Sequence, residues 1–432
     1  MTKFAHLVLG LSLACTAIAA NGPFTPYLTR KPPQIIRNLG KERQGNVEIQ
    51  HFVFFSRTAQ TANGSVRSEI SALIARPVQS GRYPGILLLH GGAGHAQESI
   101  AVDWANRGFV VLAPDLPGIG DAAKMPNAAG AWKGKYGEDH FLVAPDVTSS
   151  GIFDGVLAAV QSLYLLRAQP DVNPARVGVT GVSWGGYATI TVAGLAHKDV
   201  YAAYAIYGSG HFDLGSAFQR DALSKLPLEQ SQAWMDQLDA RNYTSGITSE
   251  FFEAAATNDT FFWVPAVTAT LEDIHSHKNL VFAPNADHWM DIPGGCQHED
   301  VQGVPHDNAW MSEQVPYFEY LLKRKGKPFP EVISASEIPA PGGVHQVCFQ
   351  VRGSVGKTAA SVYYSTCGAP WKSRKWVRVT AEQRGKWYRA QIPAKVDWLA
   401  LATDSRPVTV STGIHVSEGP VRVVPTDWVG GK

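Results

Sequence analysis

A serine between two glycines is the first group in the chain that is suited to covalent chemistry. Residues 181–185 read Gly-Val-Ser-Trp-Gly, directly after the apolar segment Arg176–Thr180 and before a helix-compatible stretch. A G-x-S-x-G turn between a strand and a helix is so tight that larger side chains would strike the neighbouring backbone. The pattern therefore predicts that Ser183 presents its hydroxyl above the end of a sheet, as a nucleophile.

A serine hydroxyl needs a histidine to take its proton, and the histidine needs a carboxylate to hold its tautomer. Both groups follow Ser183 in the chain. Asp259 lies just after the apolar segment Phe251–Ala256, and His288 lies just beyond Asn279–Phe282. The order serine, acid, histidine is the one that accompanies this turn. We therefore expect Ser183, Asp259 and His288 to form one catalytic site.

Other polar residues are weaker candidates. Asp287 remains open as the acid, but it follows the wrong strand, and we expect it to cap or orient the loop of His288. Asp273 is expected to be a solvated helix residue, and His90 to fix a loop rather than act as a base. The predicted triad requires no metal and no organic cofactor. One further polar cluster fits no zinc spacing and is better explained as a polar loop. That cluster is His298, Glu299, Asp300 and His306.

Three tryptophans lie within four residues of a predicted catalytic residue: Trp184, Trp263 and Trp289. Aromatic walls suit both sugars and aryl esters, whereas packing around the site is an equal alternative for each ring. Trp263 and Trp289 are the candidate substrate-binding residues.

The elements that must position these residues alternate between strand and helix from residue 84 onward, which favours a mostly parallel sheet with helices on both faces. Ligands of such sheets bind at the carboxyl ends of the strands. The long connections 118–150 and 210–249 are expected to wall the site. Strands are expected at Val47–Ser56, Ser68–Pro77, Pro84–Leu89, Phe109–Ala113, Arg176–Thr180, Tyr201–Tyr207, Phe251–Ala256 and Asn279–Phe282, and helices at Ile100–Asn106, Phe153–Arg167 and Ala309–Lys323.

After Pro330 the pattern changes to short alternating segments, which predict an antiparallel, immunoglobulin-like sandwich over residues 330–432 behind a catalytic domain over 21–329. Every predicted catalytic residue precedes this sandwich, so we expect the chemistry not to need it. The six expected strands are Gln346–Val351, Ser361–Thr366, Trp376–Thr380, Trp387–Ile392, Trp398–Ala402 and Val408–Ser411.

The composition and the first residues bear on partners and location. With 45% apolar residues, 17% charged residues and a net charge of +1, the chain is globular and lacks the basic footprint that nucleic acids require. Residues 1–20 have a charged start, a short apolar run and small residues in an A-x-A arrangement, which predicts a secretory signal peptide. No later segment is apolar for long enough to span a membrane.

Three cysteines follow the predicted signal: Cys296, Cys348 and Cys367. Cys348 and Cys367 lie in neighbouring strand patterns, so the sequence favours a bridge between them in an oxidising compartment. A glycosylation triplet at Asn258 would crowd Asp259, which favours a bacterial origin.

Four features together resemble the α/β-hydrolase superfamily: His-Gly-Gly at residues 90–92, the Ser183 turn, the acid after the next-to-last strand and the histidine after the last. Within it, residues 45–327 are similar to dienelactone hydrolases, acetylxylan esterases and prolyl oligopeptidase-like members. The resemblance implies ester hydrolysis by a Ser-Asp-His triad. It also implies an oxyanion hole formed by the backbone amides of Trp184 and of Gly91 or Gly92.

Fewer than 70 residues lie between the predicted cleavage site and His90, so the propeller gate of prolyl oligopeptidases does not fit. We expect a secreted or periplasmic serine hydrolase that cleaves short acyl esters of carbohydrates or aryl alcohols. A serine peptidase and a non-catalytic binding protein on a hydrolase scaffold are the alternatives. The oligomeric state stays open.

Overall fold

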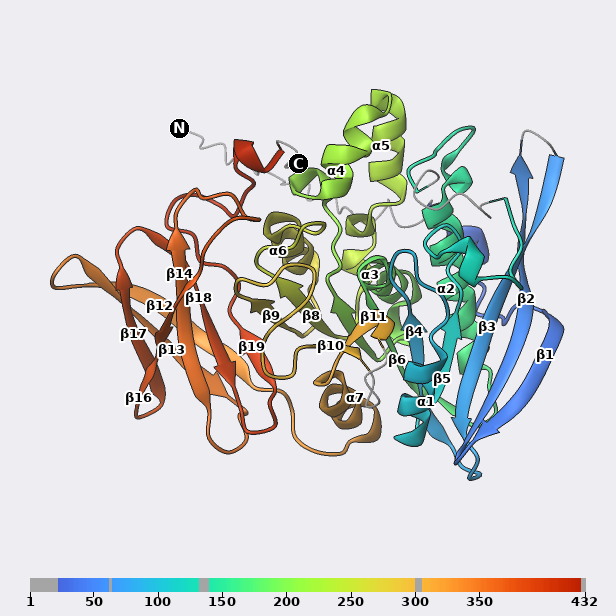
Figure 1. Ribbon diagram of the computed structural model, residues 1–432, viewed down its shortest axis with the longest axis horizontal. Helices are drawn as coiled ribbons and strands as arrows, with labels where there is room; N and C mark the ends of the chain where they lie inside the picture. Colours follow the sequence, from blue (N-terminus) through green and yellow to red (C-terminus); the bar gives the residue numbers. More distant parts are fainter. Residues whose placement is uncertain (1–21, 62–63, 132–139, 300–304, 429–432) are drawn as a thin grey trace, which may run out of the picture.

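A computed structural model describes residues 22–61, 64–131, 140–299 and 305–428, so the predicted signal peptide lies outside it. Within these residues the central element is a nine-stranded sheet of order β1-β2-β3-β5-β4-β6-β7-β8-β9 (Figure 1). Its strands are β1 Ile35–Gln44, β2 Val47–Thr61, β3 Gly64–Pro77, β4 Tyr83–Leu89, β5 Val110–Pro114, β6 Val172–Val182, β7 Ala202–Ile206, β8 Glu250–Ala256 and β9 Lys278–Ala283.

The direction of the strands changes within this sheet. β1, β2, β3 and β5 pair antiparallel, whereas β5, β4, β6, β7, β8 and β9 pair parallel. All five residues of β5 are buried, as expected for a strand that is covered on both faces. The carboxyl ends of β6, β8 and β9, which precede Ser183, Asp259 and His288, therefore meet at the same edge of the sheet.

Helices cover both faces of the sheet. Gly178 of β6 faces Phe318. Gly85 of β4 lies opposite Val177, the residue before Gly178, and faces Leu166. Because successive residues of a strand point to opposite faces, the helices that carry Phe318 and Leu166 lie on opposite sides. The helices are α1 Glu98–Asn106, α2 Gly151–Arg167, α3 Trp184–Ala196, α4 Ala217–Asp221, α5 Leu228–Gln237, α6 Val264–Asp273 and α7 Gln314–Lys323. None in the described ranges is long and apolar enough to cross a bilayer.

Two differences from the expected elements have clear reasons. The segment expected to be helical from Ala309 begins as a strand, β11 Pro305–Met311, which pairs with β10 Cys296–Glu299. The helix begins only at Gln314, with Pro316 in its first turn, where a proline costs no hydrogen bond. Strand β1 was not expected, because nearly all of its residues are exposed and no buried face imposes an alternation.

Beyond Pro330 two four-stranded antiparallel sheets face each other. They have the orders β12-β13-β17-β16 and β15-β14-β18-β19, which confirms the predicted class of an α/β-hydrolase sheet followed by a β domain. The sequence missed β12 and β16. The strands are β12 Glu331–Ala340, β13 Val344–Arg352, β14 Ala359–Thr366, β15 Val377–Thr380, β16 Glu382–Arg384, β17 Trp387–Pro393, β18 Val396–Thr403 and β19 Thr409–Ser411.

The predicted bridge between Cys348 and Cys367 is wrong, because both thiols are free. Cys348 lies on β13, in one sheet of the β domain. Cys367 follows β14, which belongs to the other sheet. β13 and β14 follow each other in the sequence but are thus not neighbours in a sheet.

The β domain docks on the edge of the central sheet, where β19 lies beside β9 (Figure 1). The amide of Phe282 on β9 donates to Ser411 Oγ on β19 at 2.8 Å. At the other end of β9, Asn279 Nδ2 donates to the carbonyl of Pro330 at 2.7 Å. Buried residues of β19 such as Val410 belong to the same continuous apolar core as the central sheet. The β domain and the α/β part are therefore packed as one body.

Candidate active site

Ser183 occupies the turn between β6 and α3. Its φ of 58° and ψ of −120° lie in a region that side chains other than glycine rarely adopt, and such strain persists only where the surroundings enforce it. Val182 and Trp184 on either side are buried, whereas Ser183 is partly exposed. The turn therefore lifts the hydroxyl of Ser183 out of the core.

The two glycines around this serine are required by close packing. A Cβ at Gly185 would collide with the carbonyl oxygens of Leu89 and His90, and one at Gly181 would collide with the backbone of Gly185. These atoms are main chain and cannot rotate away. The spacing of the sequence motif thus reflects direct contact of the turn with the end of β4.

Asp259 and His288 lie in hydrogen-bond contact at the ends of β8 and β9. Asp259 Oδ2 accepts from His288 Nδ1 at 2.8 Å, and Oδ1 accepts from the amides of Phe261 and Phe262 at 2.7 and 2.9 Å. The carboxylate is 3% exposed, so three protein donors fix it out of water. An ionised carboxylate only accepts, so the proton of His288 lies on Nδ1 and Nε2 is left as the base.

Ser183 and His288 contact consecutive residues at the end of β7. The amide of Ser183 donates to the carbonyl of Ile206 at 2.8 Å. The ring of the next residue, Tyr207, lies against the ring of His288, with 4.7 Å between the centroids. The structure thus gathers the three predicted residues at one edge of the sheet. Their catalytic roles remain predictions.

The environment of His288 raises its pKa. Burial by itself lowers the pKa of the imidazole, but the charge and hydrogen bond of Asp259 and the charge of Asp287 outweigh it, so the pKa lies above the usual 6.5. His288 is thus protonated at a higher pH than a free histidine.

Asp287 joins the loops of the acid and the histidine. Its Oδ1 accepts from the amides of Thr260 and His288 at 2.7 and 2.8 Å, and its Oδ2 accepts from Thr260 Oγ1 at 2.8 Å. These bonds hold the loop, as the sequence predicted. Asp273, expected to be a solvated helix residue, pairs with His211 Nε2 at 2.6 Å and is partly exposed.

His90 anchors the loop after β4. Its Nε2 accepts from the amide of Leu116 at 2.9 Å, so the proton lies on Nδ1, which bonds the carbonyl of Gly91 at 2.8 Å. Asp115 holds the same loop by accepting from the amide of Ala96 at 2.8 Å, and burial raises the pKa of Asp115 to about 6. These bonds agree with the prediction that His90 fixes this loop.

This loop carries the predicted oxyanion donors Gly91 and Gly92. Trp184, the third, is the first residue of α3, where amide groups have no partner within the helix. The oxyanion role of the three amides remains a prediction.

The three tryptophans near the site differ in exposure. Trp184 is 3% exposed and contacts the ring of Phe218. Trp263 is 4% exposed and packs against the tilted ring of Trp428, with 5.1 Å between the centroids. The interpretation of Trp263 as a substrate wall is therefore corrected, because its ring is used in packing. Trp289 is 56% exposed, so it stays a candidate substrate-binding residue.

Sequence reasoning missed Phe261. Its ring is 40% exposed and stands edge-on to His288, with 5.0 Å between the centroids. The sequence feature that could have indicated it is an aromatic residue two positions after the predicted acid. The backbone amide of Phe261 donates to Asp259, which fixes Phe261 beside the acid. Phe261 and Trp289 together give the surroundings of His288 an aromatic surface.

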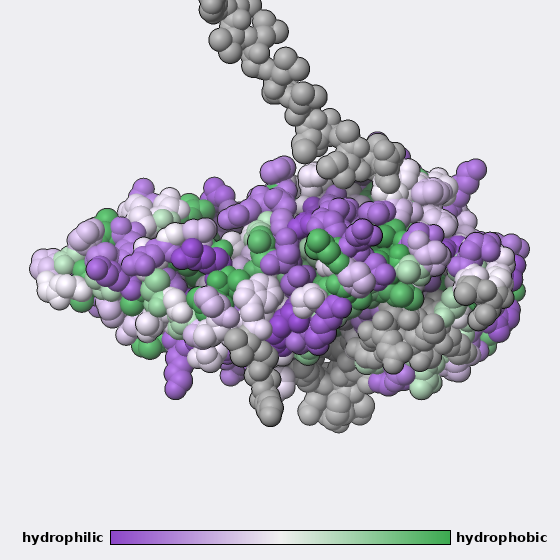
Figure 2. Space-filling model, turned by 90° about the horizontal axis from the view of Figure 1, so that it is seen from above, coloured by the Kyte–Doolittle hydropathy of each residue, from purple (hydrophilic) through white to green (hydrophobic). Residues whose placement is uncertain are grey.

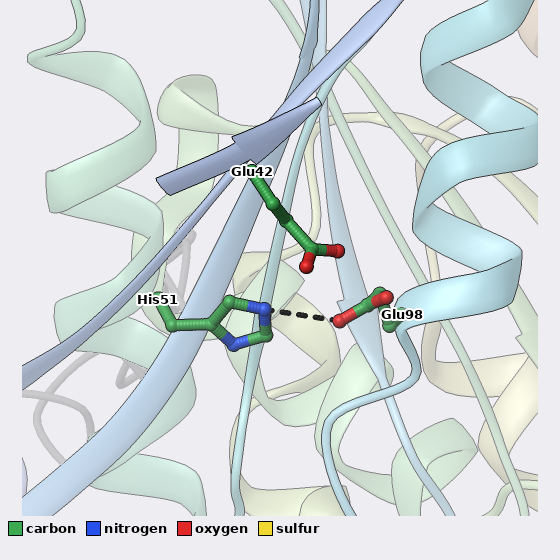
Figure 3. Close-up of side chains that lie close together, drawn as sticks. All are labelled: Glu42, His51 and Glu98. Carbon is green, nitrogen blue, oxygen red and sulfur yellow. Dashed lines mark ion pairs between the residues drawn. The ribbon is translucent and has the colours of Figure 1, made fainter. Parts of the chain in front are cut away.

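One group of side chains in the described ranges has atoms close enough to hold a metal ion. Glu42, His51 and Glu98 place ligand atoms within 4.8 Å of one another on β1, β2 and α1 (Figure 3). His51 Nε2 already pairs with Glu98 at 3.0 Å, and Gln44 Nε2 donates to both glutamates at 2.9 and 3.0 Å. These contacts already satisfy the group. The side chains of His298, Glu299, Asp300 and His306 lie outside the description.

Parallel strands with helices on both faces and a strained serine between β6 and α3 are the architecture of an α/β hydrolase. Residues 70–288, just over half of the chain, match the dienelactone hydrolase family, and the chain belongs to that family. The matched range contains Ser183, Asp259 and His288 and ends before the β domain.

Solved structures to which the chain is similar have low sequence identity to it. Acetyl xylan esterase 1 from Thermoanaerobacterium sp. JW/SL YS485 is 20% identical with a TM-score of 0.50, over 61% of this chain and 86% of that one. Acetyl xylan esterase from Paenibacillus sp. R4 is 20% identical with a TM-score of 0.49, again over 61% of this chain and 86% of that one. A putative dienelactone hydrolase from Klebsiella pneumoniae is 18% identical with a TM-score of 0.36, over 55% of this chain and 87% of that one. No curated protein matches the chain.

Proposed function

We propose that the chain is an exported serine hydrolase that cleaves short acyl esters of carbohydrates or aryl alcohols through an acyl-enzyme on Ser183. The observation that carries the proposal is the 2.8 Å bond from His288 Nδ1 to the buried Asp259, beside the strained turn of Ser183. Export is proposed from residues 1–20, and the N-terminal sequence of the mature protein tests it.

In the proposed reaction, His288 Nε2 takes the proton of Ser183 as Oγ forms a bond to the ester carbonyl carbon. The carbonyl electron pair moves to oxygen, which the amides of Trp184 and of Gly91 or Gly92 stabilise. Collapse breaks the ester bond, and the alcohol leaves with the proton from His288. Water then gives a proton to His288 and attacks the acyl carbon. Collapse breaks the bond to Ser183 Oγ, which takes the proton back from His288, and the carboxylic acid is released.

The proposed substrate class follows from the surface around His288. Phe261, whose ring contacts that of His288, and Trp289, the next residue in the sequence, are exposed large apolar residues. Figure 2 shows one face of the molecule, on which apolar patches lie among polar ones. Flat aromatic surfaces bind sugar rings and aryl groups. A net charge of +1 gives no steering toward ionic substrates. The fold shared with an acetyl xylan esterase supports the same class.

The substrate proposal is tested by comparing kcat/KM for acetylated xylan oligomers, aryl acetates, long-chain aryl esters and peptide amides. We expect the two acetyl substrates to be cleaved fastest. A clear preference for the long-chain esters or the amides would overturn the proposal.

As the pH is lowered, kcat/KM is expected to fall with a midpoint above pH 6.5; we call this fall the acid limb of the pH profile. The reaction needs neutral His288 as the base, and the structure raises its pKa, so activity is lost at a higher pH than an unperturbed histidine would give. In Asp287→Asn the limb is expected to move to lower pH, because one charge that raises the pKa is removed. The measurement is kcat/KM for a non-ionising ester between pH 5 and 9; a wild-type limb at or below pH 6.5 contradicts the prediction.

Truncation of Trp289 is expected to weaken substrate binding. Loss of one aromatic contact, worth about 1 kcal/mol, corresponds to a KM for aryl acetates that is about fivefold higher, with kcat little changed. Steady-state kinetics of Trp289→Ala measure this split. Tyr201→Ala is the matched control, since Tyr201 is also an exposed aromatic side chain but precedes β7, at the opposite end of the sheet. Equal effects of the two substitutions would remove Trp289 from the substrate site.

A further inference from the structure

A loop of the β domain reaches the residue that precedes the predicted acid. We call residues 371–376 the tether loop. Asn258 Nδ2 donates one hydrogen to the carbonyl of Lys372 at 3.0 Å and the other to the carbonyl of Arg374 at 2.7 Å. Asn258 is 9% exposed, and both donors of its amide group are used by the tether loop. The backbone next to Asp259 is thus fixed by the β domain.

The same loop holds the segment before the predicted base. Asn285 and Trp376 form a reciprocal pair, in which Asn285 Nδ2 donates to the Trp376 carbonyl at 2.9 Å and the Trp376 amide donates to Asn285 Oδ1 at 2.8 Å. Asn285 has a φ of 59°, a left-handed conformation that asparagine tolerates better than most residues. This paired turn sets the start of the loop that carries His288.

The two asparagines also belong to one network. Thr257 Oγ1 donates to Asn258 Oδ1 at 2.6 Å and accepts from the Asn285 amide at 3.0 Å. The backbone N–H of Asn258 donates to the carbonyl of Ala286 at 3.0 Å. The loops of the acid and the base are therefore connected to each other as well as to the tether loop.

The tether loop is itself held firmly. Arg374 NH1 pairs with Asp397 Oδ2 of β18 at 2.7 Å, and the two side chains are 2% and 3% exposed. The guanidinium carbon lies 3.7 Å from the ring centroid of Trp371, and the Trp371 amide donates to Asp427 Oδ1 at 2.8 Å. A buried ion pair and a cation–π contact give the loop a fixed geometry in which its carbonyls can serve as anchors.

We propose that Asn258 and Asn285 are positioning residues that hold Asp259 and His288 in register by anchoring both loops to the β domain. The proposal rests on the proposed serine hydrolase function. It makes the β domain part of the scaffold of the site, whereas the sequence placed every predicted catalytic residue before that domain and suggested independence. A displacement of about 1 Å in a catalytic group can cost about a hundredfold in rate, so such anchoring matters for activity.

The test uses the full chain with Asn258→Ala, Asn285→Ala and the control Asn279→Ala. Asn279 also donates its side-chain amide to a carbonyl near the start of the β domain, that of Pro330 at 2.7 Å, but it lies at the start of β9, away from the triad. The control therefore removes the same kind of contact without touching the loops. Asn285 is exposed, so Asn285→Ala leaves no buried cavity, whereas Asn258 is 9% exposed.

We expect Asn258→Ala and Asn285→Ala to lower kcat/KM by about ten- to a hundredfold, mainly through kcat. The acid limb is also expected to move to lower pH. A loosened Asp259 no longer raises the pKa of His288, whereas the burial that lowers this pKa persists. Thermal melting establishes that each variant is folded. Asn279→Ala is expected to keep the wild-type rate and pH profile.

Folded variants with the wild-type rate and limb overturn the proposal, and so does a loss in Asn279→Ala as large as in the other two. Failure of the proposed function is a separate result: the wild-type chain would then neither cleave esters nor react with a fluorophosphonate. Variants are therefore interpreted only against a wild-type chain that does both.

Discussion

Ser183→Ala is expected to lower kcat for an aryl acetate by about 10⁴- to 10⁶-fold, because the atom that forms the acyl bond is removed. Alanine keeps the Cβ, so the strain at φ 58° is the same in both chains. Ser183 is partly exposed, and its side chain is not a core packing group. The melting temperature should therefore stay within about a degree of the wild type.

Labelling by a fluorophosphonate gives the second readout for this substitution. The wild-type chain is expected to carry one covalent label, and Ser183→Ala to carry none, as measured by the mass of the intact protein. A folded Ser183→Ala chain that retains full esterase activity would show that another residue is the nucleophile. A wild-type chain that takes up no label would favour a binding protein on a hydrolase scaffold.

Asp259→Asn is expected to cost about 10⁴-fold in kcat, whereas Asp287→Asn is expected to cost about tenfold or less. An asparagine at 259 can present its amide group to His288 Nδ1, which favours the tautomer with the proton on the wrong nitrogen. Asp287 accepts only from the Thr260 amide and hydroxyl and the His288 amide, so its substitution loosens a loop.

The two substitutions serve as matched controls for each other, since the aspartates lie on the two connected loops and both raise the pKa of His288 through their charges. The measurement is kcat for an activated ester at a pH above the acid limb of each variant. If Asp287→Asn proved the more damaging of the two, the acid would have to be reassigned to Asp287.

The turn of Ser183 could be predicted from the sequence because its close contacts require one residue type at fixed positions. Gly181 and Gly185 leave room for main-chain atoms of the turn and of the end of β4, and the strand before the turn ends in a continuous buried run. Strand β1 could not be predicted in this way. Its segment IIRNLGKERQ is held by pairing with β2 on one side only, and almost every side chain is in water, so the segment has no apolar pattern.

The anchoring of the triad loops also escaped the sequence, because the partners are far apart along the chain. Asn258 bonds a carbonyl 116 residues away, and Asn285 bonds one 91 residues away. Backbone carbonyls carry no signature of residue type, so no motif marks the tether loop. Burial of Trp263 depends in the same way on Trp428, which lies in the last described residues.

The two edges of the central sheet are closed by different means, with a consequence for self-association. β9 is covered by β19, so its outer side cannot recruit another chain. β1 is uncovered, but it carries Arg37, Lys41, Glu42 and Arg43 and has register shifts near Ile35 and Asn38. Charged, bulged edges disfavour the addition of a further strand. Loss of the β domain would therefore leave the outer edge of β9 open to pairing with a strand of another chain.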